Sequence, residues 1–452
     1  MPMWTLPPSV AGLLAGFAPC FTAPTFPTFA ALACGFLAQT GPRTVTGMLL
    51  GARLSGVWSH DRAHAFFARA RWSADQLGLG LVDLLAAVLD QDAPLRVVVD
   101  DTLMRRSGRK VFGAGWHHDP LASGRRRVAW GNNWVVLGVL VDLPFVPQRT
   151  LCLPVLARLW CPKRTATRLE LGVELVRLLA ERYPDRRVHL VCDAAYAGRA
   201  LWGLPEQVTV TVRMRADAAL FELPPPPTGR PGRPRSRGDR LPELIVIAAL
   251  TATGWQHALV HRYGRTDPVE LAVLRCLWPG VFGTQPVQVV LVRPPGAPDG
   301  YDLALATTDL DASAAELVAR YAARWNIEVA FEEARQLAGV GQARNRTRRA
   351  VERTVPFGLT CFSLAIVWYA VCGRPAHDLA SHRARAPWYA TKQAVSVADM
   401  LAAFRRALIA AGYRAGQPLQ PTSTEILEVQ AAWAALDEEQ ARRPRSCGYR
   451  SP

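Results

Sequence analysis

Lysine is nearly missing from this sequence. Of its 53 Lys and Arg residues only Lys110, Lys163 and Lys392 are lysines, and only 37 residues are Asp or Glu. The formal net charge of +16 and a pI near 10 favour a polyanionic partner, with nucleic acid ahead of a membrane surface. Arginine, which carries nearly all of the positive charge, suits paired hydrogen bonds to phosphate, although a coding bias would produce the same excess.

The sequence also lacks paired cysteines. Its nine Cys residues stand singly, and none has the CxxC or CxxxxC spacing of a zinc ribbon or finger, which argues against that class of metal site. An odd number of scattered cysteines is typical of reduced thiols in a cytoplasm.

Long uninterrupted apolar runs are absent as well. The apolar N-terminal stretch 9–38 has no basic segment before it and is broken by Pro19, Pro24 and Pro27, so it resembles neither a signal peptide nor a membrane span. The run FSLAIVWYAV (362–371) is too short to span a bilayer and predicts a buried helix. We therefore expect a soluble, cytoplasmic protein associated with the nucleoid.

Composition and length predict a globular protein of two or three domains. Half of the 452 residues are hydrophobic and a fifth are charged, and there are no internal repeats. The first 90 residues or so read as helical. The run 59–85 begins at a possible cap, Ser59, and carries Arg62, Arg69 and Arg71, so it is either a DNA-facing helix or an ordinary packing helix.

From residue 95 the pattern changes to that of a mixed α/β core. LRVVVD (95–100) predicts a strand that ends at Asp100 and Asp101, and two further strands follow in 132–143 and 148–155. An amphipathic helix is predicted over 165–183, followed by a buried strand, RRVHLVCD, that ends at Asp193. Ligand sites in such sheets gather at the carboxyl ends of strands.

A basic segment rich in Pro and Gly (222–243) interrupts the core and is followed by four β-like runs. Within it, GRPGRPR places Arg230, Arg233 and Arg235 in the pattern of an AT-hook, which enters the minor groove of DNA. A phosphate-binding loop or a plain linker would have the same composition. Beyond residue 340 the chain is predicted to be helical, with a polar, frayed tail.

The stretch YAARWNIEVAFEEAR (321–335) predicts one amphipathic helix. At about 100° per residue, Tyr321, Arg324, Glu328 and Arg335 fall within an arc of roughly 60°, opposite an apolar back. By itself this face could be a solvated charged surface. Trp325 beside it is either a core residue or a platform on which an unpaired base stacks.

Three acids from distant parts of the chain could meet in one cleft: Asp100, Asp193 and Glu328. Carboxylates are preferred ligands of Mg²⁺, and phosphodiester cleavage commonly uses two such ions. Asp101 is a rival to Asp100, because neighbouring strand residues point to opposite faces, and Glu332 is a rival to Glu328. His117 and His118 have no partners at ligand spacing, which favours a structural or DNA-proximal role.

These motifs resemble those of bacterial insertion-sequence transposases. Tyr321, Arg324 and Glu328 match the YREK signature of that family, in which Arg335 stands in place of Lys. The segments VVVDDTLMRRSG and VCDAAYAG resemble those around its first and second catalytic acids. The resemblance runs over roughly residues 95–370 and implies a DDE active site on a ribonuclease-H-like fold.

The resemblance implies a role for each residue. Two Mg²⁺ ions, for which Mn²⁺ can substitute, would be bound by Asp100, Asp193 and Glu328. With these ions the protein would catalyse cut-and-paste transposition. Arg324 and Arg335 would hold phosphates, and Tyr321 would hydrogen-bond one. The partners would be the terminal inverted repeats and target DNA, bound by a homodimer. Because Arg rarely releases a proton, Arg335 puts any proton-transfer role of that position in doubt.

The sequence patterns and the resemblance together divide the chain. They predict a helical DNA-binding region over 1–92, the first part of the catalytic core over 93–213, a basic loop and β-rich insertion over 214–300, the second part of the core over 301–345, and a helical region over 346–452. Two rival functions remain. One is a DNA-binding regulator derived from a transposase that has lost catalysis. The other is an aspartyl phosphotransferase. The absence of the Asp-x-Asp-x-Thr motif of that class argues against it.

Overall fold

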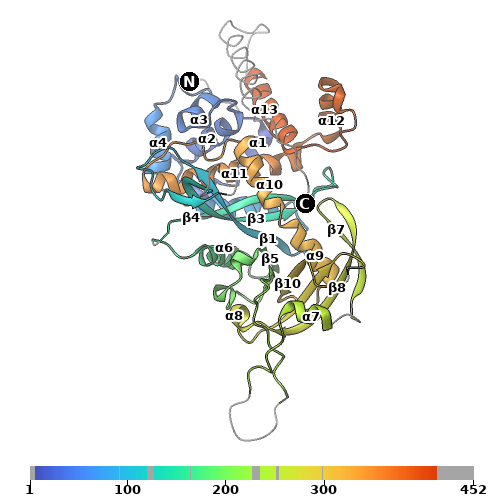
Figure 1. Ribbon diagram of the computed structural model, residues 1–452. Coiled ribbons are helices and arrows are strands. Elements are labelled where there is room, and N and C mark those ends of the chain that lie inside the picture. The colour runs from blue at the N-terminus through green and yellow to red at the C-terminus, as the bar shows by residue number, and fades with distance from the viewer. Residues whose placement is uncertain are drawn as a thin grey trace. The chain divides into compact units, whose positions relative to one another are not determined.

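The computed structural model describes residues 6–90, 92–119, 127–162, 164–226, 235–250, 254–297 and 299–414. The chain forms two compact units: unit 1 combines Met1–Leu85 with Glu333–Pro452, and unit 2 is Ala86–Glu332. Unit 1 is helical and unit 2 is built on a sheet, so the protein is a mixed α/β protein (Figure 1).

Unit 2 contains a mixed sheet that has ten strands in the described residues, with the order β2-β3-β1-β5-β6-β10-β9-β8-β7 and β4 paired to β3. Its strands are β1 (Leu95–Arg105), β2 (Gly115–His118), β3 (Val128–Val141), β4 (Leu151–Trp160), β5 (Val188–Cys192), β6 (Val208–Arg213), β7 (Gln256–Arg262), β8 (Arg265–Leu277), β9 (Pro286–Arg293) and β10 (Leu303–Thr307). Its helices are α6 (Arg168–Arg182), α7 (Leu244–Leu250), α8 (Pro279–Phe282), α9 (Ala314–Ala323) and the start of α10 (Asn326–Gln336), with 3-10 turns η2 (Ala194–Tyr196) and η3 (Arg199–Leu201).

The first half of this sheet has the order β4-β3-β1-β5-β6. β3 is antiparallel to both of its neighbours here, β1 and β4, whereas β5 and β6 run parallel to β1. The central strands are apolar because both of their faces are covered; Val97, Val98 and Val99 are all buried. This order is consistent with the ribonuclease-H-like core that the resemblance implies.

Strands β7 to β10 continue the same sheet. β10 pairs antiparallel with β6 on one side and with β9 on the other, and β8 and β7 follow outward. β6 was not predicted, although the alternation in VTVTVR (208–213) is the pattern of a strand. Because β6 joins the two halves, it links the strands after residue 255 to those that carry Asp100 and Asp193.

The predicted end of the first strand was wrong. β1 does not stop at Asp100 and Asp101 but continues to Arg105, because β3 pairs with it as far as Arg105↔Gly131. The two acids therefore lie in the middle of a long strand.

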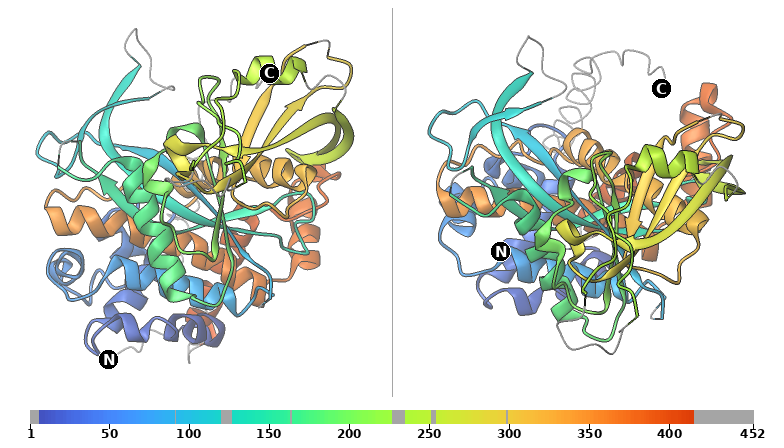
Figure 2. Two further views of the ribbon diagram at one scale, coloured as in Figure 1. Left: turned by 90° about the horizontal axis from the view of Figure 1, so that it is seen from below. Right: turned by 60° about the horizontal axis from the view of Figure 1, so that its bottom comes forward.

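Helices α6 and α9 cover opposite faces of the sheet (Figure 2). α6 begins with a capping box of Thr167 and Glu170, and its Gly172 lies against the side chain of Val99. α9 leads to Arg324, which contacts Asp100. Since Val99 and Asp100 are neighbours on one strand, their side chains point to opposite faces.

Unit 1 packs its helices around Phe357. Phe357 belongs to α11. Its ring lies edge-on to the rings of Phe29, Phe36, Phe66 and Phe67, with ring centroids 5.2–6.1 Å apart. The helices are α1 (Pro8–Ala15), α2 (Phe26–Ala38), α3 (Val45–Gly51), α4 (His60–Ala68), α5 (Ala74–Ala86), α11 (Arg348–Cys372), α12 (Pro375–Arg385) and α13 (Val397–Arg414), with 3-10 turns η1 (Ala18–Cys20) and η4 (Pro387–Tyr389).

The run 362–371 lies within α11, and this helix of 25 residues has the length and composition to cross a membrane. However, 83% of its most apolar stretch is buried in the fold, which is the property of a core helix that the sequence predicted.

The run 59–85 is two helices, α4 and α5, and not one. Ser59 does cap α4, accepting a hydrogen bond from the backbone N–H of Asp61. The chain then turns so that Trp72 can be buried, with its Nε1 donating to the carbonyl of Phe66 at 2.8 Å. Of the three arginines in the run, Arg62 stacks on the ring of Trp58 at 3.6 Å.

Candidate active site

Two of the predicted acids lie side by side on adjacent parallel strands. Val99 of β1 is in register with Cys192 of β5, so Asp100 and Asp193 are the next residues along the two strands. Asp193 directly follows β5 and is the N-cap of the 3-10 turn η2. The prediction that acids follow the strands therefore holds for Asp193 and fails for Asp100.

The third acid comes from a break between two helices, where the sequence predicted one. α9 ends at Ala323 and α10 begins at Asn326. The side-chain amide of Asn326 donates to the carbonyl of Ala323 at 2.9 Å, which replaces a hydrogen bond that a continuous helix would have made. Tyr321 thus lies at the end of α9, Arg324 in the junction, and Glu328 in the first turn of α10.

Arg324 and Tyr321 connect the three acids. The Arg324 guanidinium lies 2.7 Å from Oδ2 of Asp100 and 3.5 Å from Oε1 of Glu328. The Tyr321 hydroxyl donates to Oδ1 of Asp193 at 3.2 Å. Three residues that are far apart in the sequence are therefore gathered around one arginine and one tyrosine.

The cluster is largely withdrawn from water. The side chains of Arg324 and Asp100 are 11% and 18% exposed, whereas that of Glu328 is 38% exposed. Tyr321 is buried. Asp100 and Arg324 thus form the inner part of the site, and Glu328 lies at its rim.

Two of the three carboxyls, those of Asp100 and Glu328, have raised pKa values because they are withdrawn from water. Burial raises the pKa of Asp100 to about 6, although Arg324 opposes the rise. Burial also raises the pKa of Glu328; Arg324 opposes this and Asp193 adds to it. The pKa of Tyr321 is raised to about 12, first by burial and then by the charge of Asp193. An added cation would lower the pKa of both carboxyls.

The donor set suits a hard divalent cation, because it consists of carboxylate oxygens near a partly exposed rim. As the described residues are arranged, no group of three or more His, Cys, Asp or Glu side chains is placed to hold a metal ion. Arg324 lies between Asp100 and Glu328 instead. The oxygen ligands of these acids are therefore of the kind that such an ion prefers. Arg324 has to move away before Asp100 and Glu328 can bind the same ion.

The geometry distinguishes Asp100 from its rival Asp101. Asp101 faces the α6 side of the sheet, where its Oδ2 accepts from Asn133 and Arg168, both at 2.9 Å, and its Oδ1 from the hydroxyl of Tyr196 at 3.4 Å. Asp101 is thus already bound by three partners on the face away from Arg324.

Asn133 and Arg168 were not among the predicted site residues. A signal for Arg168 was present, because the Thr-x-x-Glu capping box of 167–170 places it in the first turn of α6. Nothing in the sequence shows that Asn133 lies opposite this acid, since that depends on the register between β1 and β3. The rival third acid, Glu332, is exposed, and it is Glu328 that shares Arg324 with Asp100.

The remaining predicted residues lie elsewhere. Arg335 is half-buried in the last turn of α10, in the part of that helix that belongs to unit 1. Trp325 is 44% exposed and is therefore not a core residue. Arg235 is exposed and pairs with Asp239 at 2.9 Å, while Arg230 and Arg233 lie outside the described residues. His117 is buried, with its ring 5.5 Å from that of Trp160, which fits a structural role.

A family model with the description "DDE superfamily endonuclease" matches residues 16–267, which include Asp100 and Asp193 and end before Glu328. No curated protein matches the sequence.

Proposed function

Because the chain belongs to the DDE superfamily endonucleases, whose model matches more than half of it, we propose that it is a DNA transposase of the cut-and-paste type. The observation that carries the proposal is the cluster around Arg324, where Asp100 and Glu328 meet beside the Asp193–Tyr321 pair. The signature around Glu328 and its insertion-sequence origin are part of the proposal.

Nucleases of this superfamily use divalent metal ions. Asp100, Asp193 and Glu328 would hold two of them, with Mg²⁺ as the proposed ion and Mn²⁺ as a substitute. Such ions supply Lewis-acid stabilisation of the attacking and leaving oxygens. In the first reaction water attacks a phosphodiester at the transposon end and frees a 3′-hydroxyl. In the second, that hydroxyl attacks a phosphodiester of the target DNA and displaces one strand end.

Arg324 and Tyr321 have two tasks in this proposal. Without DNA they hold the acids together through the contacts at 2.7 and 3.2 Å. With DNA, a phosphate competes for the same N–H and O–H donors, because phosphate oxygens accept charge-assisted hydrogen bonds as carboxylates do. The arrival of the scissile phosphate thus loosens Arg324 from Asp100.

Other residues would hold the DNA on either side of the cut. Arg335, two turns after Glu328 on α10, is proposed to bind a backbone phosphate. Trp325 is exposed and would stack on an unpaired base. Arg230, Arg233 and Arg235 are proposed to reach a minor groove. A homodimer on paired transposon ends would bring both cleavage sites and the target DNA together.

The second candidate function is a DNA-binding regulator descended from such an enzyme. The observation in its favour is that Arg324 already neutralises Asp100 and Glu328, so that the described residues hold no ready metal site. In that case Tyr321 and Arg324 would be DNA contacts only.

A cleavage assay separates the two functions. The purified protein is given Mg²⁺ and DNA that carries the ends flanking its own gene, beside Asp100→Asn, Asp193→Asn and Glu328→Gln. Cutting at the end by wild type, lost in all three variants while DNA is still bound, supports the transposase. Binding without cutting by wild type supports the regulator, and cutting by Glu328→Gln would refute the assignment of the third acid.

A further inference from the structure

α12 and the turn after it present two unusually exposed aromatic side chains. Trp388 is 74% exposed and Tyr389 is 58% exposed, with ring centroids 6.3 Å apart. Large apolar groups that lie together at the surface commonly mark an interaction site. We call Arg374, Arg383, Arg385 and these two aromatic residues the α12 surface.

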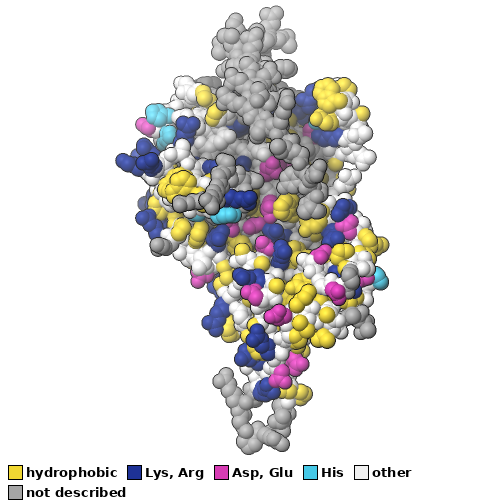
Figure 3. Space-filling view, in the orientation of Figure 1, with side chains coloured by type: hydrophobic (Ala, Val, Ile, Leu, Met, Phe, Trp, Pro, Cys, Tyr) yellow, Lys and Arg dark blue, Asp and Glu magenta, His cyan; other side chains and the backbone are white. Residues whose placement is uncertain are grey.

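The exposed charge around the α12 surface is positive. Residues 366–411 are all described, and they contain only two acids, Asp378 and Asp399, which are both buried. The three arginines of the α12 surface are exposed. Figure 3 shows hydrophobic and cationic side chains beside each other over α12. The charge of this surface therefore complements a polyanion.

The turn that carries the aromatic residues is held in place by buried Asp399. This carboxylate accepts from the backbone N–H and the hydroxyl of Ser396, both at 2.8 Å, and from Lys392, and it lies 3.0 Å from Nδ1 of His382. Arg383 donates from Nε to the carbonyl of Lys392 at 2.9 Å. These bonds tie α12 to the segment 392–399, which follows the two aromatic residues.

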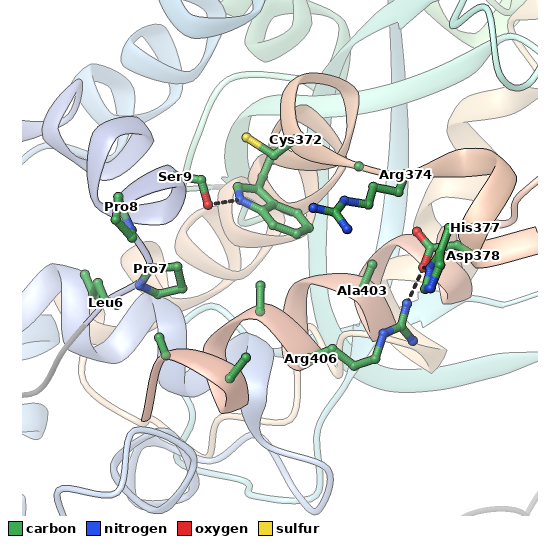
Figure 4. A pocket seen from close by; sticks show the side chains of 15 residues that line it. Leu6, Pro7, Pro8, Ser9, Cys372, Arg374, His377, Asp378, Ala403 and Arg406 are labelled. Atoms are coloured by element: carbon green, nitrogen blue, oxygen red, sulfur yellow. Dashed lines mark hydrogen bonds and ion pairs between the residues drawn. The ribbon is translucent and has the colours of Figure 1, made fainter. Parts of the chain in front are cut away.

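A pocket of about 740 Å³ extends the surface at the other end of α12 (Figure 4). Arg374, which precedes the helix, and Arg406 on α13 line it, and Asp378 pairs with Arg406 at 2.5 Å. The 11 residues of α12 separate this pocket from the aromatic residues. At 1.5 Å per residue the surface is about 16 Å long, which is about five base-pair steps of duplex.

We propose that the α12 surface binds DNA, with phosphates on its arginines and an unpaired or distorted base stacked on Trp388 and Tyr389. Exposed aromatic rings between cations are the arrangement by which proteins bind single-stranded nucleic acid. The choice of DNA over another polyanion rests on the proposed function. The surface lies in unit 1, whereas the acids lie in unit 2, so the two can be tested independently.

The test measures binding of a fluorescein-labelled blunt duplex, and of the same duplex with a short single-stranded extension, by fluorescence anisotropy with the full chain. Trp388→Ala and Tyr389→Ala are each expected to weaken binding of the extended duplex roughly 5- to 100-fold and to affect the blunt duplex less. Trp388→Phe keeps a ring and should restore most of the affinity.

A second variant tests the charges without removing a ring. Replacing Arg374, Arg383 and Arg385 by Gln should weaken binding of both duplexes and reduce the slope of log K against log salt by roughly 2–3. The matched controls lie in unit 2: Leu259→Ala removes a side chain of a 72% exposed residue, and Arg265→Gln removes a charge that is 75% exposed.

The outcomes separate this inference from the proposed function. Weaker binding by the α12 variants with normal cutting at saturating DNA supports both. If wild type never cuts but the α12 variants lose affinity, the inference holds and the transposase fails. Affinities and salt slopes equal to those of the two controls would overturn the inference, and a change in sedimentation without a change in affinity would reassign the surface to a protein contact.

Discussion

Substitution of Arg324 by Met should show that this arginine is coupled strongly to Asp100 and weakly to Glu328. Its contact with Asp100 is 2.7 Å long, between side chains that are 11% and 18% exposed. Its contact with Glu328 is 3.5 Å long, and that acid is 38% exposed. Breaking a buried ion pair costs about 3–5 kcal/mol, whereas an ion pair with one exposed partner contributes about 0.2–1 kcal/mol.

The assay is a pair of double-mutant cycles on the free energy of unfolding in urea. One cycle combines Arg324→Met with Asp100→Asn, and the other combines it with Glu328→Gln. We expect a coupling energy of about 2–3 kcal/mol in the first cycle and below about 1 kcal/mol in the second, both at pH 8. Equal couplings, or none with Asp100, would refute the geometry described for the site.

The pH dependence gives an independent check on Asp100. Its pKa in the fold is about 6 against an ordinary value of 3.8, so the fold favours the protonated carboxyl. The contribution of this group to stability is therefore full below about pH 4 and is lost as the pH rises through about 6. The loss approaches about 3 kcal/mol, from about two pKa units at 1.36 kcal/mol each. Asp100→Asn should remove this part of the pH profile, and an unchanged profile would contradict the burial of Asp100.

Three further predictions concern metal binding, the hydrogen bond from Tyr196 to Asp101, and the aromatic core of unit 1. Mn²⁺ should raise the melting temperature of wild type but not of Asp100→Asn, since only the acidic site gains from a bound cation; an equal rise in both would place the ion elsewhere. Tyr196→Phe removes one hydrogen bond to Asp101 on the face away from Arg324 and should leave the Mg²⁺ concentration needed for half-maximal cutting unchanged; a shifted metal titration would mean that Asp101 takes part in holding the ion. Phe357→Ala should cost about 3–5 kcal/mol in the free energy of unfolding, against less than about 0.5 kcal/mol for the control Val371→Ala on the same helix; similar costs would mean that the aromatic cluster is not the core of unit 1.

The acids could be named from the sequence because local motifs surround each of them. Asp193 follows a short apolar strand, which is a pattern that strand prediction recognises. The end of the first strand could not be found in the same way. The acidic pair Asp100 and Asp101 looks like the end of the apolar run, but pairing with β3 keeps the chain extended as far as Arg105. Tertiary pairing decided that boundary, and local propensity did not.

The helix break at Arg324 was hidden for a different reason. The spacing of Tyr321, Arg324 and Glu328 fits one continuous helix, and no Pro or Gly interrupts it. At the break the side chain of Asn326 bonds back to the carbonyl of Ala323. Asn has a weak preference for such local bonds, so its position alone predicts nothing. The partners of Asp101 were equally out of reach, because they come from β3, α6 and η2.

Unit 1 has a consequence for synthesis on the ribosome. Its core is shared between the two ends of the sequence: Phe29, Phe36, Phe66 and Phe67 emerge first, and Phe357, on which they pack, emerges after all of unit 2. At about 5–20 residues per second, translation takes roughly 15–60 s to pass from Leu85 to Cys372. For that time the early helices lack α11, and their apolar faces are open to chaperones or to other nascent chains. A messenger cut short before α11 would therefore yield a sheet unit with an unfinished helical unit attached, and not a smaller working protein.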